Sequence, residues 1–206
     1  MLTDKQLDIF ANFAKYPFKE LTRQEVKHLA NEKSNNALTL AFSQFKKENL
    51  LLEKKVGKSS LYKLNFNEKT TIHYLALCNE KRLKKVAKDS LSEIIMEVKK
   101  STAFFTIVIF GSYATGEENK SSDLDVAIIT NDKAKIKEIE RNLSSAKLKS
   151  IIELDTHVII YDDFFKMLIN QEENLGKQIA RKHLVMYNHQ LFYDLIYEGM
   201  NHGFKY

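Results

Sequence analysis

The stretch from residue 107 to 129, IVIFGSYATGEENKSSDLDVAII, constrains the fold of this chain more than any other part. It contains two apolar runs joined by a Gly-Ser turn and a short polar loop. Each run is rich in β-branched residues and has the length of a buried strand. The stretch therefore predicts a sheet core in the second half of the chain.

The second of these strands contains two carboxylates, Asp123 and Asp125. Side chains at i and i+2 on a strand project from the same face, because side chains alternate with a period of 2. Like charges at that distance repel each other unless a cation lies between them, and a hard divalent ion such as Mg²⁺ takes oxygen ligands. A Gly-Ser turn that enters a helix offers N–H groups and a hydroxyl to phosphate oxygens. Together these features predict a nucleotide site.

The spacing of Gly111-Ser112, ten residues and then Asp123-Leu124-Asp125 resembles the signature of the DNA polymerase beta-like nucleotidyltransferases, especially their minimal members. The resemblance covers about residues 104–160. It implies that Gly111, Ser112 and Ser122 contact an NTP donor, with ATP the expected one. It also implies that Asp123, Asp125 and a third carboxylate bind two Mg²⁺ ions, which activate the attacking hydroxyl and stabilise the leaving pyrophosphate.

The third carboxylate is expected on the strand formed by SIIELDTHVIIY, where Glu153, Asp155 and His157 share one face. Members of the family usually have an aspartate on this strand, and Asp155 is the residue we assign as catalytic and metal-binding. An alternative register places His157 at that position. Imidazole is a poorer partner for Mg²⁺ than carboxylate, so the second register would weaken two-metal catalysis.

One position departs from the family pattern. Many minimal members have Ala-Arg-Gly after the turn, whereas this chain has Ala114-Thr115-Gly116. The change removes a guanidinium that could meet phosphate.

The first third of the chain is basic. Residues 1–66 contain 12 Lys and Arg against 7 Asp and Glu, whereas residues 67–206 contain 20 of each, so the formal excess of +5 lies entirely in the first segment. Such a segment has the charge expected of a nucleic-acid-binding domain, although a soluble lysine-rich surface has the same composition.

The layout of residues 1–66 resembles a winged helix-turn-helix. Thr3 and Thr22 begin capping boxes of two helices, a third helix runs to about Glu48, and LLLEKKV, a Gly57 turn and LYKLNF predict a β-hairpin. The resemblance implies that the third helix enters a major groove and that basic side chains of its end and of the hairpin meet phosphates. The implied DNA-binding residues are Asn35, Asn36, Thr39, Ser43, Lys46, Lys47, Lys54, Lys55 and Lys58. The alternative is a dimerisation or scaffolding module that does not bind DNA.

Residues 67–100 are predicted to be a helical linker with one apolar side, which either packs on the sheet or forms the seam of a homodimer. Residues 101–206 are predicted to be the minimal nucleotidyltransferase domain with C-terminal helices, and Asp162-Asp163 reads as an N-cap pair for the first of them. The fold class is therefore α+β: a winged helix-turn-helix followed by a small nucleotidyltransferase α/β sheet domain with a helical tail.

The composition limits where such a chain works. No apolar run has the length of a membrane span, and the N-terminus lacks the pattern of a secretory signal, so we expect no membrane partner. Cys78 is the only cysteine, so no internal disulfide is possible, and a reducing cytoplasm is the expected compartment.

Two functions are compatible with these patterns. The first is transfer of a nucleoside monophosphate from an NTP to a hydroxyl, whose acceptor is a protein side chain, as in toxin–antitoxin nucleotidyltransferases, a small molecule or an RNA end. The second is a DNA-binding transcriptional regulator whose nucleotidyltransferase domain senses nucleotide or is inert. A scaffold that uses both domains for protein interactions is the third alternative.

Overall fold

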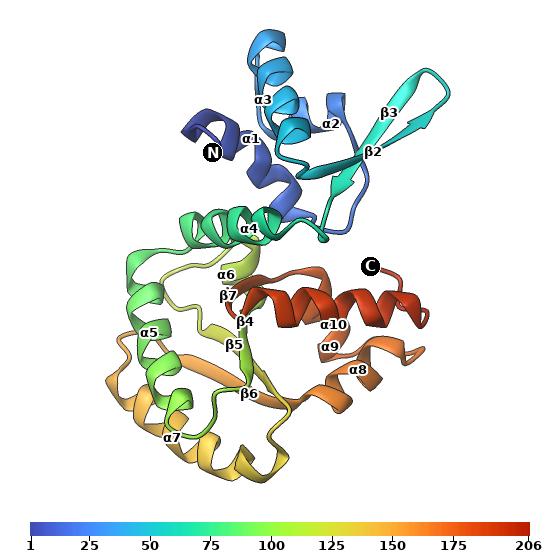
Figure 1. Ribbon diagram of the computed structural model, residues 1–206. Coiled ribbons are helices and arrows are strands. Elements are labelled where there is room, and N and C mark those ends of the chain that lie inside the picture. The colour runs from blue at the N-terminus through green and yellow to red at the C-terminus, as the bar shows by residue number, and fades with distance from the viewer. The chain divides into compact units, whose positions relative to one another are not determined.

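The computed structural model describes all 206 residues and divides into two compact units, residues 1–80 and residues 81–206 (Figure 1). The division falls inside the segment predicted as a linker. The helix α4 (Lys69–Arg82) belongs almost entirely to the first unit, where Tyr74 donates a hydrogen bond of 2.8 Å to Glu48.

The first unit consists of three helices, a hairpin and α4. Its further elements are α1 (Asp4–Lys15), β1 (Leu21–Thr22), α2 (Arg23–Leu29), α3 (Asn35–Lys47), β2 (Leu51–Val56) and β3 (Ser59–Leu64). The three strands form an antiparallel sheet in the order β1-β3-β2. The capping boxes at Thr3 and Thr22 are both present, as the sequence predicts.

The core of the first unit is aromatic. Phe10, Phe13 and Phe45 are completely buried, and the ring of Phe10 meets that of Tyr74 edge-on at 5.8 Å. Aromatic side chains bury a large apolar area and favour edge-to-face contacts, so this cluster fastens α1, α3 and α4 to one another. Cys78 is buried in the same unit, as expected for a core residue.

The second unit is built on a four-stranded sheet in the order β6-β5-β4-β7. Strand β5 pairs parallel with β6 and antiparallel with β4, which in turn pairs antiparallel with β7. The strands are β4 (Phe105–Ile109), β5 (Leu124–Thr130), β6 (Leu154–Ile160) and β7 (Leu184–Tyr187). The helical elements are α5 (Lys85–Lys99), α6 (Gly111–Thr115), a 3-10 turn (Lys133–Lys135), α7 (Ile136–Lys149), α8 (Tyr161–Ile169), α9 (Leu175–Arg181) and α10 (His189–Asn201).

Helices cover both faces of this sheet (Figure 1). Apolar residues of α5 and α7 form one continuous core with alternate residues of the central strands, for example Ile94 and Ile139 with Ile107 and Val126. Helices α8 and α10 contact the strands from the other side. All five residues of β4 are buried, because a central strand covered on both faces has no side chain in solvent.

One local prediction is refined and another is wrong. The segment 67–100, predicted as helical, consists of two helices, α4 and α5, separated at Leu83-Lys84, where Lys84 has an extended backbone (φ −68°, ψ 153°). No glycine or proline announces this break. Asp162 and Asp163 do not cap α8 but lie inside its first turn after Ile160, where their charges face the positive end of the helix dipole.

The observed architecture is mixed α+β, in agreement with the predicted class. None of the helices combines the length and the apolar character that crossing a membrane requires.

Candidate active site

The turn between β4 and α6 lies directly against the Asp125 side chain. Gly111 has a φ of +65°, and a Cβ atom built on it would overlap Oδ2 of Asp125 and lie 2.9 Å from its Cγ. The preceding residue, Phe110, donates its backbone N–H to the carbonyl oxygen of Asp125 at 3.1 Å. Gly111 of the turn and Asp125 of the strand, which are 14 positions apart in the sequence, therefore form one local structure.

Asp125 and Asp155 are neighbours across the parallel pair β5–β6. They are Cα partners in the ladder, and this register places Ala127 beside His157. Burial raises the pKa of the Asp125 carboxyl above its usual value, and the charges of Asp155 and Asp123 raise it further. Asp125 is thus repelled by both neighbouring carboxylates, as expected of a site that gains from a cation.

His157 contacts Asp155 rather than replacing it. Its Nε2 lies 3.1 Å from Oδ2 of Asp155, and its ring centroid lies 5.7 Å from that of Phe110. Both side chains are partly exposed. His157 lies two residues farther along β6 than Asp155, and its charge lowers the pKa of Asp125 against the larger effects that raise it.

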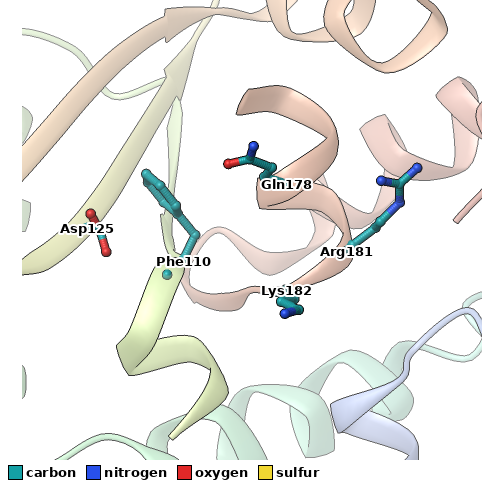
Figure 2. A pocket seen from close by; sticks show the side chains of 6 residues that line it. Phe110, Asp125, Gln178, Arg181 and Lys182 are labelled. Atoms are coloured by element: carbon teal, nitrogen blue, oxygen red, sulfur yellow. The ribbon is translucent and has the colours of Figure 1, made fainter. Parts of the chain in front are cut away.

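A pocket of about 470 Å³ opens beside this turn (Figure 2). One wall consists of Phe110, Gly111 and Asp125, and the other is the last turn of α9 with its side chains. Figure 2 shows the Gln178 amide directed toward Phe110, while Arg181 and Lys182 extend from the end of the helix. Ligand pockets typically measure about 300–1,000 Å³, so the volume suits a nucleotide or part of one.

Comparison with known proteins agrees with this geometry. The sequence model of the family described as “Polymerase beta, Nucleotidyltransferase” matches residues 92–187. A “Putative protein adenylyltransferase” of Methanocaldococcus jannaschii is 30% identical over 95 residues, which cover 42% of this chain and 96% of that protein. The chain belongs to the polymerase beta-like nucleotidyltransferases. Membership of this family implies an NTP donor and a divalent metal ion.

One solved structure resembles this chain more weakly. It is described as “Crystal structure of the toxin-antitoxin with AMP-PNP”, and it is 20% identical with a TM-score of 0.35. The match covers 53% of this chain and 86% of that one.

Only two of the residues predicted for the nucleotidyltransferase site line the pocket, namely Gly111 and Asp125. Asp123 is exposed and immediately precedes β5, and Asp155 is exposed on β6. The Ser122 hydroxyl accepts a hydrogen bond of 2.9 Å from the N–H of Asn119 and so closes the loop. Ser112 lies half-buried in α6.

Thr115, at the position where many relatives have arginine, is engaged within the turn. Its hydroxyl lies 3.0 Å from the carbonyl oxygen of Ser112 and 2.8 Å from a carboxylate oxygen of Glu117. The next acidic residue, Glu118, is paired with Lys84 at 2.6 Å. The turn of this nucleotidyltransferase therefore contributes no cation to the pocket.

Sequence reasoning missed the α9 wall. Gln178, Arg181 and Lys182 belong to no motif and lie more than 50 positions after Asp125. The only hint in the sequence is the adjacent basic pair Arg181-Lys182, which is too common to single out.

The residues present suit a divalent cation in their chemistry. Asp123, Asp125 and Asp155 are oxygen donors of the kind that Mg²⁺ prefers. Burial and the charges of Asp155 and Asp123 raise the pKa of the Asp125 carboxyl, and His157 offsets this only in part. No three His, Cys, Asp or Glu side chains of the chain are already gathered as a complete ligand set. Binding would therefore require the exposed aspartates to turn toward Asp125, which their exposure permits.

The first unit has a groove of its own, of about 660 Å³, between α3 and the β2–β3 hairpin. Of the predicted DNA-binding residues, Thr39, Ser43 and Lys46 line it, whereas Lys54, Lys55 and Lys58 lie exposed on the hairpin. Asn36 and Lys47 are exposed on α3.

Arg23 is a further lining residue, and the sequence reasoning did not single it out. Its guanidinium hydrogen-bonds the Thr39 hydroxyl and the carbonyl oxygen of Asn35. The amide oxygen of Asn35 in turn accepts a hydrogen bond of 2.6 Å from Lys27. Polar groups at the start of α3 thus already form hydrogen bonds with other residues of the first unit.

Proposed function

We propose that the chain catalyses the Mg²⁺-dependent transfer of a nucleoside monophosphate from an NTP, with ATP as donor, to a hydroxyl group. The observation that carries this proposal is the pairing of Asp125 with Asp155 beside the Gly111 turn, at the edge of a pocket of nucleotide size.

In the proposed reaction the hydroxyl oxygen of the acceptor forms a bond to the α-phosphorus, and the bond from that phosphorus to the oxygen that bridges to the β-phosphorus breaks. Pyrophosphate leaves, and the hydroxyl proton passes to the Asp155 carboxylate. Asp123, Asp125 and Asp155 would hold Mg²⁺, which when bound lowers the charge on the phosphates and orients the attacking and leaving oxygens. Gly111, Ser112 and Ser122 would contact the triphosphate.

The proposed acceptor is a hydroxyl on a protein side chain. The name of the Methanocaldococcus jannaschii relative supports this choice, because the chain matches nearly the whole length of that protein. A toxin protein would be a partner of this kind. RNA ends and small molecules remain the acceptors against which the proposal has to be tested.

We further propose that residues 1–66 act as a winged helix-turn-helix and bind DNA. The order of three helices and a hairpin, the antiparallel pairing of the hairpin with β1, and three exposed lysines on the hairpin support this proposal. The net charge of +5 on the segment has the sign that phosphate contacts require.

The second candidate function is a DNA-binding regulator whose nucleotidyltransferase domain binds nucleotide without transferring it. The observation that favours it is Thr115, which leaves the turn without the arginine of many relatives. A nucleotide-sensing regulator predicts nucleotide binding as the enzyme does, so a transfer assay separates these two. A regulator whose domain is inert predicts no nucleotide binding.

The first experiment is a thermal-shift scan of the full chain with ATP, GTP, CTP and UTP, with and without Mg²⁺. A ligand at about a hundred times its dissociation constant stabilises the folded state by about 2.7 kcal/mol, which is a measurable shift. The shift should require Mg²⁺ and should be lost in Asp125→Ala but kept in Asp163→Ala, which removes an exposed aspartate of α8. No shift with any nucleotide would contradict nucleotidyl transfer and would favour a regulator whose nucleotidyltransferase domain is inert.

Transfer itself is tested with ATP labelled at the α-phosphate and, in parallel, at the γ-phosphate. Nucleotidyl transfer places the α-label on the acceptor and releases the γ-label in pyrophosphate. Phosphoryl transfer places the γ-label on the acceptor and leaves the α-label in ADP. Incubation with a lysate, followed by protease or ribonuclease treatment, then shows whether the acceptor is protein, RNA or a small molecule. Nucleotide binding without any labelled product would favour the regulator.

A further inference from the structure

The wall of the pocket opposite Asp125 carries the opposite charge. Of the six residues that line the pocket, the one carboxylate is Asp125 and the two cations are Arg181 and Lys182, at the end of α9 (Figure 2). A pocket with a carboxylate on one side and two cations on the other is complementary to a polyanion that reaches the protein together with a divalent metal ion.

The two cations differ in how they are held. Arg181 donates a hydrogen bond of 2.6 Å to the carboxylate of Glu173, and its guanidinium lies 5.9 Å from the ring centroid of Phe204. Its position is therefore fixed and its charge is partly neutralised. Lys182 has no carboxylate partner, and its side chain is exposed.

The backbone around Lys182 fixes the position of its Cα atom. Lys182 ends α9 with an extended conformation, and the next residue, His183, is buried with its Nδ1 2.7 Å from the carbonyl oxygen of Ala180. The residue on its C-terminal side is therefore anchored in the core, while the Lys182 side chain itself is exposed and lines the pocket.

The Gly-Ser turn does not supply this charge. The Thr115 hydroxyl donates a hydrogen bond to the Glu117 carboxylate, and Glu118 forms an ion pair with Lys84. Arg82 donates a hydrogen bond of 2.6 Å to the carbonyl oxygen of Ala114 in α6, but neither Arg82 nor any basic residue of the turn lines the pocket.

We propose that Lys182, assisted by Arg181, binds the β- and γ-phosphates of the donor and replaces the missing arginine of the turn. This inference rests on the proposed function, since it assigns the phosphate contacts of the same site. Gln178, one turn earlier on α9, lies on the same wall and would contact the part of the donor nearer to Phe110.

The test is isothermal titration of the full chain with Mg²⁺-ATP, with AMP and with inorganic tripolyphosphate. Lys182→Ala removes a charge-assisted hydrogen bond, so the affinity for ATP and for tripolyphosphate should fall about tenfold. Lys182→Glu should cause a larger loss. AMP lacks the β- and γ-phosphates, so its affinity should change less than twofold. Lys147→Ala, which removes an exposed lysine of α7, is the matched control and should bind every ligand like wild type.

A second variant gives a change in the opposite direction. Glu173→Gln removes the counter-charge of Arg181, so ATP and tripolyphosphate should bind a few-fold more tightly, while AMP should be unaffected. Lys182 and Glu173 are both exposed, so Lys182→Ala and Glu173→Gln should each have the melting temperature of the wild-type protein in the absence of ligand.

The outcomes separate this inference from the proposed function. If Lys182→Ala binds tripolyphosphate and ATP as Lys147→Ala does, the inference is overturned while the proposed function stands. An equal loss of AMP and ATP affinity would also overturn it, because it would place Lys182 at another part of the nucleotide. If wild type binds no NTP in the presence of Mg²⁺, both the proposed function and the inference are overturned.

Discussion

Gly111 and Asp125 are in contact so close that the first of them has no room for a side chain. The backbone at residue 111 has a φ of +65°, a value that residues with a Cβ atom rarely adopt. A Cβ there would also overlap the Asp125 carboxylate. Two independent reasons, conformation and space, therefore require glycine at this position. The contact also explains how a turn and a distant strand come to form one site.

Gly111→Ala is expected to destabilise the second unit and to disturb the Asp125 side chain. The positive φ alone costs on the order of 1 kcal/mol for a residue with a Cβ, and the overlap adds to it. The control is Gly116→Ala, where φ is +79° but nothing lies within 4 Å of the added Cβ. Chemical denaturation should show a larger loss of unfolding free energy for position 111, and Mg²⁺-dependent nucleotide binding should fail only there.

A double variant isolates the contact. In Gly111→Ala combined with Asp125→Ala the overlapping atoms are gone, because they belong to the Asp125 carboxylate. The loss caused by Gly111→Ala should then shrink to that of Gly116→Ala. Strict additivity of the two single changes would mean that the overlap is relieved by a movement elsewhere.

Asp125→Asn is expected to stabilise the metal-free protein at neutral pH. Burial and the neighbouring aspartates raise the pKa of Asp125 above 3.8 in the folded state, so the folded protein binds the proton more tightly than the unfolded chain does. Stability is consequently lost as pH rises from 3.8 through the folded pKa, and the uncharged amide avoids that loss. The gain should be complete above the folded pKa and absent below pH 3.8.

The measurement is the melting temperature of Asp125→Asn and wild type from pH 3.5 to about 8, without and with Mg²⁺. In a domain of this size 1 kcal/mol corresponds to about 2–4 °C, so a shift of that order is resolvable. Added Mg²⁺ should stabilise wild type and reverse the ranking. Asp163→Asn, which removes a partner 3.4 Å from Lys166, should give no gain at any pH.

Acid should destabilise the second unit through His183, which is buried, and His189, which is partly buried. Burial lowers the pKa of His183 to about 4 and, likewise, that of His189 to about 4. The unfolded chain binds protons from pH 6.5 downward while the folded one does not, so stability falls between pH 6.5 and 4. Each group accounts for at most on the order of 3 kcal/mol of that fall.

His183→Asn tests this slope, because the amide retains an N–H near the position of Nδ1, which lies 2.7 Å from the carbonyl oxygen of Ala180. The loss of the ring, which packs 4.8 Å from that of Phe192, lowers stability at every pH. The difference in unfolding free energy from wild type should therefore narrow as pH falls from 6.5 to 4. His202→Asn, at an exposed position, should keep the wild-type slope.

The sequence predicts those features of the fold that depend on local patterns. Strand β4 and the helix caps at Thr3 and Thr22 could be located because apolar runs and capping boxes are readable within a few residues. The break at Lys84 has no glycine, proline or side-chain cap, so no local pattern marks it.

Only the Asp125 side of the candidate site was predictable from the sequence. Asp125 belongs to a recognisable motif, whereas the strand register determines whether Asp155 or His157 is its neighbour on β6. Register depends on pairing over the whole strand, and single residues do not encode it. The end of α9 reaches the pocket through tertiary packing, so Arg181 and Lys182 have no signature at all.

Alanine at Lys54 and Lys58 is expected to weaken DNA binding by the full chain without changing its sequence preference. Both side chains are exposed on the hairpin of the first unit, and contacts of lysines with phosphates are electrostatic and independent of base identity. The logarithm of the binding constant falls with the logarithm of salt concentration, and the slope should decrease by about 0.9 for each phosphate contact that is lost. Fluorescence anisotropy with labelled duplexes at several salt concentrations measures this slope. Asp125→Asn and Lys147→Ala should bind DNA like wild type, whereas an unchanged slope in the Lys54 and Lys58 variants would assign the hairpin to another partner.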